Sequence, residues 1–266
     1  MSEVSYLPLI EDMTWSYSRI ETFSDCPYRF FLKYISNISE SDRFYASYGS
    51  FIHSLIERYY KKELSKEELE TEFLLGFSNN VKGVRPPQST VDKYIKCGSE
   101  YFRNFKPFDF NMVGVEKKVS FEIDGLPFIG YIDYLGEKDG EYFAIDNKSR
   151  DLKPRSKRKK PTQKDQELDK MLRQMYIYST AVKQEFGKFP KALCFNCFKS
   201  GIFIEEPFNI DAYNETIEWV KKNINDIKTA DDFYPYLDYF ACNNICGVSE
   251  ECIYHQTEIE ERRRGV

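Results

Sequence analysis

Two short segments, Gly130-Tyr131-Ile132-Asp133 and Ala144-Ile145-Asp146-Asn147-Lys148, decide how this chain is interpreted. Each carboxylate follows an isoleucine in a β-rich run, and the 136–141 stretch (GEKDGE) between the runs is typical of a hairpin turn. Residues two apart on a strand share a face, so Asp146 and Lys148 should point the same way, with Asp133 joining them from the neighbouring strand. Two carboxylates and an ammonium group at one point could hold a hard divalent cation beside a phosphate or an attacking water.

The periodicity around these segments predicts an α/β protein. Strands are expected at 113–121, 127–135 and 141–147, broken by Asp124-Gly125 and Asp139-Gly140, with one or two more within 191–208. The first hundred residues are mostly helical in pattern: a capping box at 18–21 should open one short helix, and Pro27 should start another. Further helices are expected at 49–62, 65–77, 90–105, 168–185 and 210–227.

Length and charge limit the classes of function. A chain of 266 residues with 41% hydrophobic content can bury a sizeable core. Its net charge of −5 argues against a protein that coats nucleic acid nonspecifically. Since the sequence has no run of 18 apolar residues and no leader pattern at its start, we expect a cytoplasmic protein without membrane association.

One segment departs from this acidic balance. Residues 153–164 (KPRSKRKKPTQK) contain seven Lys or Arg and no acid, directly after the strand that carries Lys148. Such a loop could contact a phosphate backbone near the metal site. The alternative is a solvated linker.

Three other polar side chains are candidates for the same site. His53 lies beside the apolar stripe of the predicted 49–62 helix, and a neutral imidazole is a common metal ligand. The alternative is a structural histidine satisfied by Glu57, one turn further on. Gln174 and Tyr178 are four residues apart, so their amide and phenol share one helix face and could orient a phosphate, a water or a lysine. This spacing is also frequent on ordinary helices.

The cysteines form a second, independent pattern. The C-terminal part reads Cys242-x3-Cys246-x5-Cys252, and Cys26 lies far upstream before a proline. Four such thiolates could bind an iron–sulfur cluster or a zinc ion. Disulfides are less attractive, because seven cysteines is an odd count and nothing in the sequence indicates export.

Taken in chain order, these motifs resemble the PD-(D/E)XK nuclease superfamily, in its RecB-like branch with a four-cysteine iron–sulfur cluster. That branch includes the nuclease domains of bacterial helicase–nucleases and the CRISPR-associated adaptation exonucleases. The resemblance extends from about Ser18 to Cys252. The matching segments are Ser18-Arg19-Ile20-Glu21-Thr22-Phe23 with Cys26-Pro27, Gly49-Ser50-Phe51-Ile52-His53, Gly130-Tyr131-Ile132-Asp133, Ile145-Asp146-Asn147-Lys148, Gln174-x3-Tyr178 and the C-terminal cysteines. The first gap between those cysteines is three residues, where the family usually has two.

The resemblance implies a fold and a set of site residues. The fold would be a restriction-endonuclease-like α/β core, a mixed central sheet flanked by helices, with a helical N-terminal elaboration and a cysteine-bound C-terminal tail. Mg²⁺ or Mn²⁺ would be held by the metal ligands, and other side chains would act on the water and the phosphate. The implied metal ligands are His53, Asp133, Asp146 and the Asn147 carbonyl; the implied catalytic residues are Asp133, Asp146, Lys148, Gln174 and Tyr178. Glu116 is either an acid that supports this set or a surface residue.

The resemblance also implies an arrangement of the chain as one compact unit. Residues 1–110 would be a helical region carrying Cys26 and His53, residues 111–230 the nuclease core, and residues 231–266 the iron–sulfur segment. Cys26, Cys242, Cys246 and Cys252 would hold a 4Fe–4S cluster, with zinc as the alternative occupant.

The implied activity is that of a metal-dependent deoxyribonuclease, an exonuclease acting on single-stranded DNA or DNA ends. A helicase or an integrase would be its partner in recombination, repair, replication or CRISPR adaptation, since the sequence has no Walker-type phosphate loop of its own. The alternative is a catalytically weak nuclease-fold subunit that binds DNA or a partner.

Overall fold

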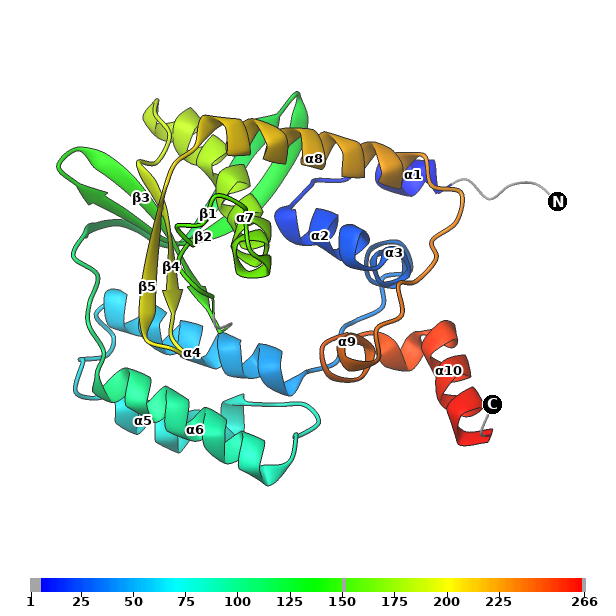
Figure 1. Ribbon diagram of the computed structural model, residues 1–266, viewed down its shortest axis with the longest axis horizontal. Coiled ribbons are helices and arrows are strands. Elements are labelled where there is room, and N and C mark those ends of the chain that lie inside the picture. The colour runs from blue at the N-terminus through cyan, green and yellow to red at the C-terminus, as the bar shows by residue number, and fades with distance from the viewer. Residues whose placement is uncertain (1–5, 150–151, 265–266) are drawn as a thin grey trace.

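A five-stranded mixed sheet forms the centre of the computed structural model, which describes residues 6–149 and 152–264 (Figure 1). The strands lie in the order of the chain: β1 (Asn111–Ile123), β2 (Leu126–Lys138), β3 (Glu141–Lys148), β4 (Ala192–Cys197) and β5 (Ile202–Pro207). Neighbours are antiparallel except β3 and β4, which are parallel because helix α7 (Gln163–Phe186) connects them. Residues 1–5 and 265–266, included in the expected terminal regions, lie outside the description.

Two tight turns set the register of the first three strands. Asp124-Gly125 and Asp139-Gly140 each place two consecutive residues at positive φ, between 50° and 76°, as a two-residue hairpin of type I′ requires. The predicted turn at 136–141 was too long, because residues 136–138 are paired within β2 and only Asp139-Gly140 turn the chain. The narrower turn brings Asp133 opposite Asp146, next to the pair Tyr134 and Ile145.

The helices match most of the predicted segments, with shifted ends. Their bounds are α1 (Leu7–Ile10), α2 (Tyr17–Asp25), α3 (Pro27–Phe30), a π-helical turn η1 (Phe31–Ile35), α4 (Phe44–Tyr60), α5 (Leu69–Asn80), α6 (Gln88–Arg103), α8 (Ile210–Lys228), α9 (Tyr239–Asn244), a 3₁₀ turn η2 (Ser249–Glu251) and α10 (Ile253–Arg264). The predicted capping box at 18–21 was wrong. Ser16 caps α2 by accepting from the Arg19 amide, while Glu21, well inside the helix, accepts from the Tyr17 hydroxyl at 2.6 Å.

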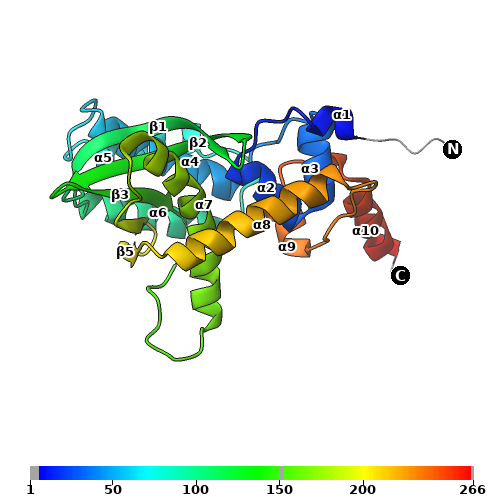
Figure 2. The same ribbon diagram turned by 90° about the horizontal axis from the view of Figure 1, so that it is seen from above.

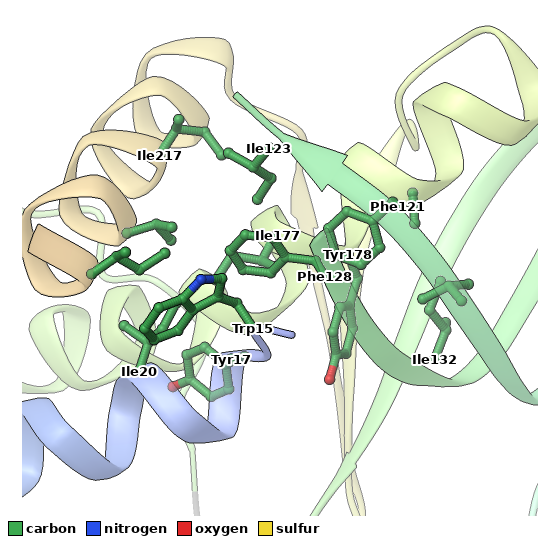
Figure 3. Packing of buried hydrophobic residues seen from close by; sticks show 14 of the residues in the cluster. Trp15, Tyr17, Ile20, Phe121, Ile123, Phe128, Ile132, Ile177, Tyr178 and Ile217 are labelled. Atoms are coloured by element: carbon green, nitrogen blue, oxygen red, sulfur yellow. The ribbon is translucent and has the colours of Figure 1, made fainter. Parts of the chain in front are cut away.

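Different helices cover the two faces of the sheet. On one face, α2, α7 and α8 pack on β1 and β2 around the fully buried Trp15, together with Ile20, Phe128 and Ile177 (Figure 3). On the other face, α4, α5 and α6 bury a separate cluster rich in aromatic side chains. The expected α/β architecture, a mixed sheet flanked by helices, is confirmed.

The C-terminal segment returns to the N-terminal helices (Figure 1). Val248 and Cys252 pack against Leu32 of η1 in a small apolar cluster. The buried Arg43 donates to Ser249 Oγ at 2.9 Å, so polar contacts also join the two ends of the chain. Within the described residues, no helix has both the length and the apolar character needed to cross a bilayer.

Candidate active site

The two aspartates face each other at the end of the β2–β3 hairpin. Asp133 and Asp146 are 9% and 4% exposed, so both carboxylates are almost fully removed from water. The Asn147 backbone amide donates to Asp133 Oδ2 at 2.8 Å, which fixes one carboxylate directly to the neighbouring strand. Strand pairing therefore places both acids before any ion binds.

Helix α4 brings His53 to this pair from outside the sheet. His53 Nε2 lies 3.1 Å from Asp133 Oδ2 and 3.2 Å from the Asn147 carbonyl oxygen. Its Nδ1 lies 3.6 Å from Glu116 Oε1, on β1. The predicted alternative, a histidine paired with Glu57, is not what forms, because Glu57 contacts the ammonium of Lys61 instead.

Glu116 is closer to the site than sequence patterns indicated. Its carboxylate, His53 and Asp133 form the one group of His, Cys, Asp and Glu side chains, among the described residues, whose ligand atoms all lie within 4.8 Å. The Glu116 backbone has a φ of 47°, a left-handed conformation that is rare for a non-glycine residue inside a strand. Such local strain is found where the surrounding structure needs a side chain in a particular direction.

Lys148 lies between the second aspartate and helix α7. Its ammonium donates to Gln174 Oε1 at 2.9 Å and lies 2.9 Å from Asp146 Oδ2. The second contact is not aligned as a hydrogen bond, and Asp146 Oδ2 is a buried oxygen without a hydrogen-bond partner in the described structure. The Lys148 ammonium is therefore the positive partner of this buried oxygen.

Tyr178 closes the site from α7, and its position explains a glycine of the first motif. A Cβ atom on Gly130 would lie 2.4 Å from the ring of Tyr178, closer than side chains can approach. Burial raises the pKa of Tyr178 to about 12, and a hydrogen bond with Gln174 opposes part of that rise. The phenol is therefore neutral near pH 7 and available as a donor.

A cleft of about 530 Å³ between α2, α4 and α7 is lined by five of these residues: His53, Glu116, Asn147, Lys148 and Gln174. Tyr17 and Glu21 of α2 line it as well. Asp133, Asp146 and Tyr178 do not line the cleft; they contact its lining through His53, Lys148 and Gln174.

The four predicted cysteines also come together, at the far end of the molecule. Burial raises the pKa of Cys242, Cys246 and Cys252, and the charges of other thiols in the set, including Cys26, raise it further. Every pair among the four interacts in this way. No three of the sulfurs lie within 4.8 Å of one another in the described structure.

The comparison with known families agrees with the geometry. The family model described as the PD-(D/E)XK nuclease superfamily matches residues 14–253. This chain belongs to the PD-(D/E)XK nuclease superfamily. Membership indicates a hydrolase that acts on nucleic acid, and PD-(D/E)XK nucleases typically use Mg²⁺ or Mn²⁺.

Among solved structures, the chain is similar to a "Putative exonuclease" from Eubacterium rectale, with 13% identity and a TM-score of 0.54 over 97% of this chain and 92% of that one. At that identity the likeness supports the fold. A second structure, named SSO0001, has 15% identity and a TM-score of 0.30 over 71% of this chain and 81% of that one, too low to support an argument. No curated protein matches this PD-(D/E)XK chain.

The residues at the cleft fit the divalent cation that PD-(D/E)XK nucleases use. Burial raises the pKa of Asp133 to about 7, the charge of Asp146 adds to that rise, and His53 opposes it. Burial lowers the pKa of His53, but its contacts with Glu116, Asp133 and Asp146 outweigh this and raise it to about 9. The carboxylates therefore attract a positive charge strongly, and the oxygen-rich donor set suits a hard cation.

Proposed function

We propose that this PD-(D/E)XK chain is a metal-dependent exodeoxyribonuclease of the RecB-like branch, which hydrolyses phosphodiester bonds at DNA ends. The observation that carries the proposal is that His53 contacts Glu116 and Asp133 while Lys148 contacts Asp146, with His53, Glu116 and Lys148 lining one cleft. A protein that only binds an anionic backbone gains nothing from buried carboxylates facing it, because they repel phosphate.

Each side chain has a role that follows from its contacts. His53, Asp133, Asp146 and the Asn147 carbonyl would hold Mg²⁺ or Mn²⁺, and Glu116 would join them or fix His53. The bound cation would lower the pKa of a water ligand and neutralise charge on the phosphate. Lys148 would position the attacking water and stabilise the negative charge that develops on the phosphate.

Gln174 and Tyr178 would act on Lys148 or on the substrate. Gln174 accepts a hydrogen bond from the lysine ammonium, which limits the directions in which that long side chain can point. Tyr178 bonds to Gln174 and so holds the amide in turn. A fixed ammonium stabilises the transition state at a smaller entropic cost than a mobile one.

The test is cleavage of end-labelled DNA with Mn²⁺ or Mg²⁺ by the wild type, Lys148→Ala and Asp146→Ala. Removing either group should slow cleavage by about a hundred- to a thousandfold. Lys118→Ala, at an exposed lysine of β1, is the matched control and should cleave at the wild-type rate. Equal rates in all four proteins would contradict the assignment.

Closed circular DNA separates exonuclease from endonuclease. An exonuclease should degrade linear single- or double-stranded DNA and leave covalently closed circles of the same sequence intact. Cleavage of circles at the linear rate would overturn the exonuclease proposal while leaving the nuclease assignment in place.

An iron–sulfur cluster, preferably 4Fe–4S, is proposed for Cys26, Cys242, Cys246 and Cys252. Four cysteine thiolates are the usual ligand set of such a cluster. Within this proposal, residues 231–266 are a segment that the cluster attaches to helical residues 1–110 and to the core at 111–230. Equal iron and sulfide content after anaerobic purification would support it, and zinc alone would contradict it.

The proposed substrate and partners follow from the same reasoning. DNA, single-stranded or at an end, would enter the cleft, and a separate helicase or integrase would supply such ends in recombination, replication or CRISPR adaptation. Pull-down of a helicase or integrase with the catalytically inactive Lys148→Ala protein would test this.

A further inference from the structure

The connection between β3 and α7 projects away from the sheet together with the first turns of α7 (Figure 2). We call residues 156–162 the basic hook. Its tip has the sequence KRKKP at 157–161, so four of its five residues are cationic and none is acidic. Lys157, Arg158, Lys159 and Lys160 are all exposed, and none pairs with an acidic residue that the structure describes.

A single carboxylate closes the basic hook at its base. Asp165 accepts hydrogen bonds from the backbone amide and the hydroxyl of Ser156, both at 2.7 Å. It also accepts from the backbone amide and the hydroxyl of Thr162, at 2.6 and 2.7 Å, within the capping box of α7. These four bonds hold the pKa of Asp165 well below its usual range. The carboxylate therefore stays charged and keeps the two ends of the basic hook together.

A second set of contacts anchors the residues just before the basic hook. Arg155 donates to Glu206 on β5 and to Asp169 on α7, both at 2.7 Å. Leu152 is buried in the cluster beneath α7. Arg155, two residues before the tip, thus binds acidic residues of the protein, whereas the four cations of the tip are exposed to solvent. This division differs from that of a free linker, in which all the charges would be equivalent.

The charge of the tip contrasts with the rest of the molecule. The chain has a net charge of −5, and removing the four positive charges of the tip would leave −9. A body that acidic repels nucleic acid, so a nuclease built on it needs a local attractive surface. Four adjacent cations on the basic hook provide such an attractive surface. Because Asp165 already fixes the base of the hook, less chain entropy is lost when the hook binds DNA.

The basic hook also has a defined position relative to the cleft. Ser149, before it, and Met171, after it, both line the cleft. The start of α7 at Gln163 is eight residues from Met171, or about 12 Å along the helix axis. That distance corresponds to about four base pairs of duplex. The base of the basic hook therefore lies about four base pairs from Met171 along α7, in a position to contact phosphates other than the scissile one.

We propose that the basic hook binds the phosphate backbone of the DNA about four or more nucleotides from the bond that is cleaved. This inference rests on the proposed nuclease function and adds a second contact to it. The contact is equally strong in the ground state and in the transition state, so it raises affinity without changing the chemical step.

The test measures DNA binding as a function of salt, by fluorescence anisotropy, in the Lys148→Ala background so that DNA stays intact. The hook variant carries Lys157→Gln, Arg158→Gln, Lys159→Gln and Lys160→Gln. The control variant carries Lys66→Gln, Arg85→Gln, Lys93→Gln and Lys106→Gln, four exposed cations on another side with the same charge change. We expect the hook variant to bind about ten- to a hundredfold more weakly at 0.1 M salt than the control variant.

The salt dependence identifies the interaction. Removing one cation that neutralises a phosphate lowers the slope of log K against log salt by about 0.9 for duplex DNA and about 0.7 for a single strand. The slope of the hook variant should therefore be smaller by up to about 3.6 on duplex DNA and by up to about 2.8 on single-stranded DNA. With Lys148 restored, its single-turnover cleavage at saturating DNA should equal that of the wild type.

Two outcomes would overturn the proposal in different ways. If the hook and control variants bind DNA with the same Kd and the same slope, the basic hook does not touch the DNA, and the nuclease assignment still stands. If the Lys148→Ala parent binds neither single- nor double-stranded DNA, the proposed function fails and the inference fails with it.

Discussion

The carboxylate site and the cysteine site of this molecule are built in opposite ways. Asp133 and Asp146 are thirteen residues apart and lie on neighbouring strands, where backbone pairing fixes them. Cys26 and Cys242 are more than 200 residues apart, and none of the six residues of α9, which carries Cys242, is buried. The first site is held by the sheet; the second is held by a small apolar cluster and a few hydrogen bonds between the two ends of the chain.

This difference predicts what the proposed cation and the proposed cluster would each contribute. At the carboxylate site the fold buries Asp133 and Asp146 close together, so the protein already bears the cost of two neighbouring carboxylates, which Lys148 offsets in part from 2.9 Å. At the cysteine site, burial favours neutral thiols, and the packing that surrounds them is thin. We therefore expect loss of ligands at the first site to affect chemistry, and at the second to affect stability.

The largest expected effect is on stability, from Cys26→Ser. Joining Cys26 to the C-terminal cysteines closes a loop of more than 200 residues, a constraint worth about 5 kcal/mol if the estimate for disulfides applies. The variant should lose iron and melt about 10 °C lower or more in an anaerobic thermal scan. Cys97→Ser, on α6, is the control and should keep both. Unchanged melting of Cys26→Ser would remove the contrast between the two sites.

Glu116→Gln should affect the carboxylate site and leave stability unchanged. It removes one charge from the group formed with His53 and Asp133, so Mn²⁺ affinity should fall about ten- to a hundredfold. Calorimetric titration of Mn²⁺ without DNA measures this, and excess metal should restore cleavage. Glu122→Gln, at an exposed position on the same strand, should bind Mn²⁺ normally. Normal Mn²⁺ affinity in Glu116→Gln would show that this carboxylate is not a metal ligand and only orients His53.

The smallest effect should come from Gly130→Ala, which disturbs the packing of Tyr178 and, through it, the position of Gln174. The added methyl group conflicts with the ring of Tyr178, so we expect a loss of about 1–3 kcal/mol in the free energy of unfolding. Cleavage should also slow, because the displaced phenol no longer holds Gln174. The double variant Gly130→Ala with Tyr178→Ala should lose less stability than the sum of the two single variants, because the conflict is absent once the ring is removed, and its cleavage should stay slow. Urea denaturation measures the free energy of unfolding of each variant. Gly49→Ala is the control and should be as stable as the wild type, because a Cβ at residue 49 would make only ordinary contacts, the nearest at 3.6 Å.

Patterns in the sequence were sufficient for most of the fold. Alternating apolar residues and two Asp-Gly turns predicted the first three strands, and helical periodicity predicted the helices that flank them. Ends were less certain: α4 begins at Phe44, five residues before the predicted start, and α9 and α10 were not predicted at all. The six residues of α9 include none that is buried, so this helix has no apolar face to predict it.

The sequence by itself determined which chemical groups are available at the carboxylate site. In the Gly-x-x-Asp and Asp-x-Lys motifs, the two-residue period of a strand already fixes which side chains share a face. It also determined three closely spaced thiols with a fourth far upstream, and a cationic segment in an acidic chain. Only the tertiary structure decided that Glu116 faces His53, that Tyr178 needs a glycine at position 130, and that Asp165 closes the basic hook. Periodicity describes one element at a time, whereas these contacts depend on the register and packing between elements.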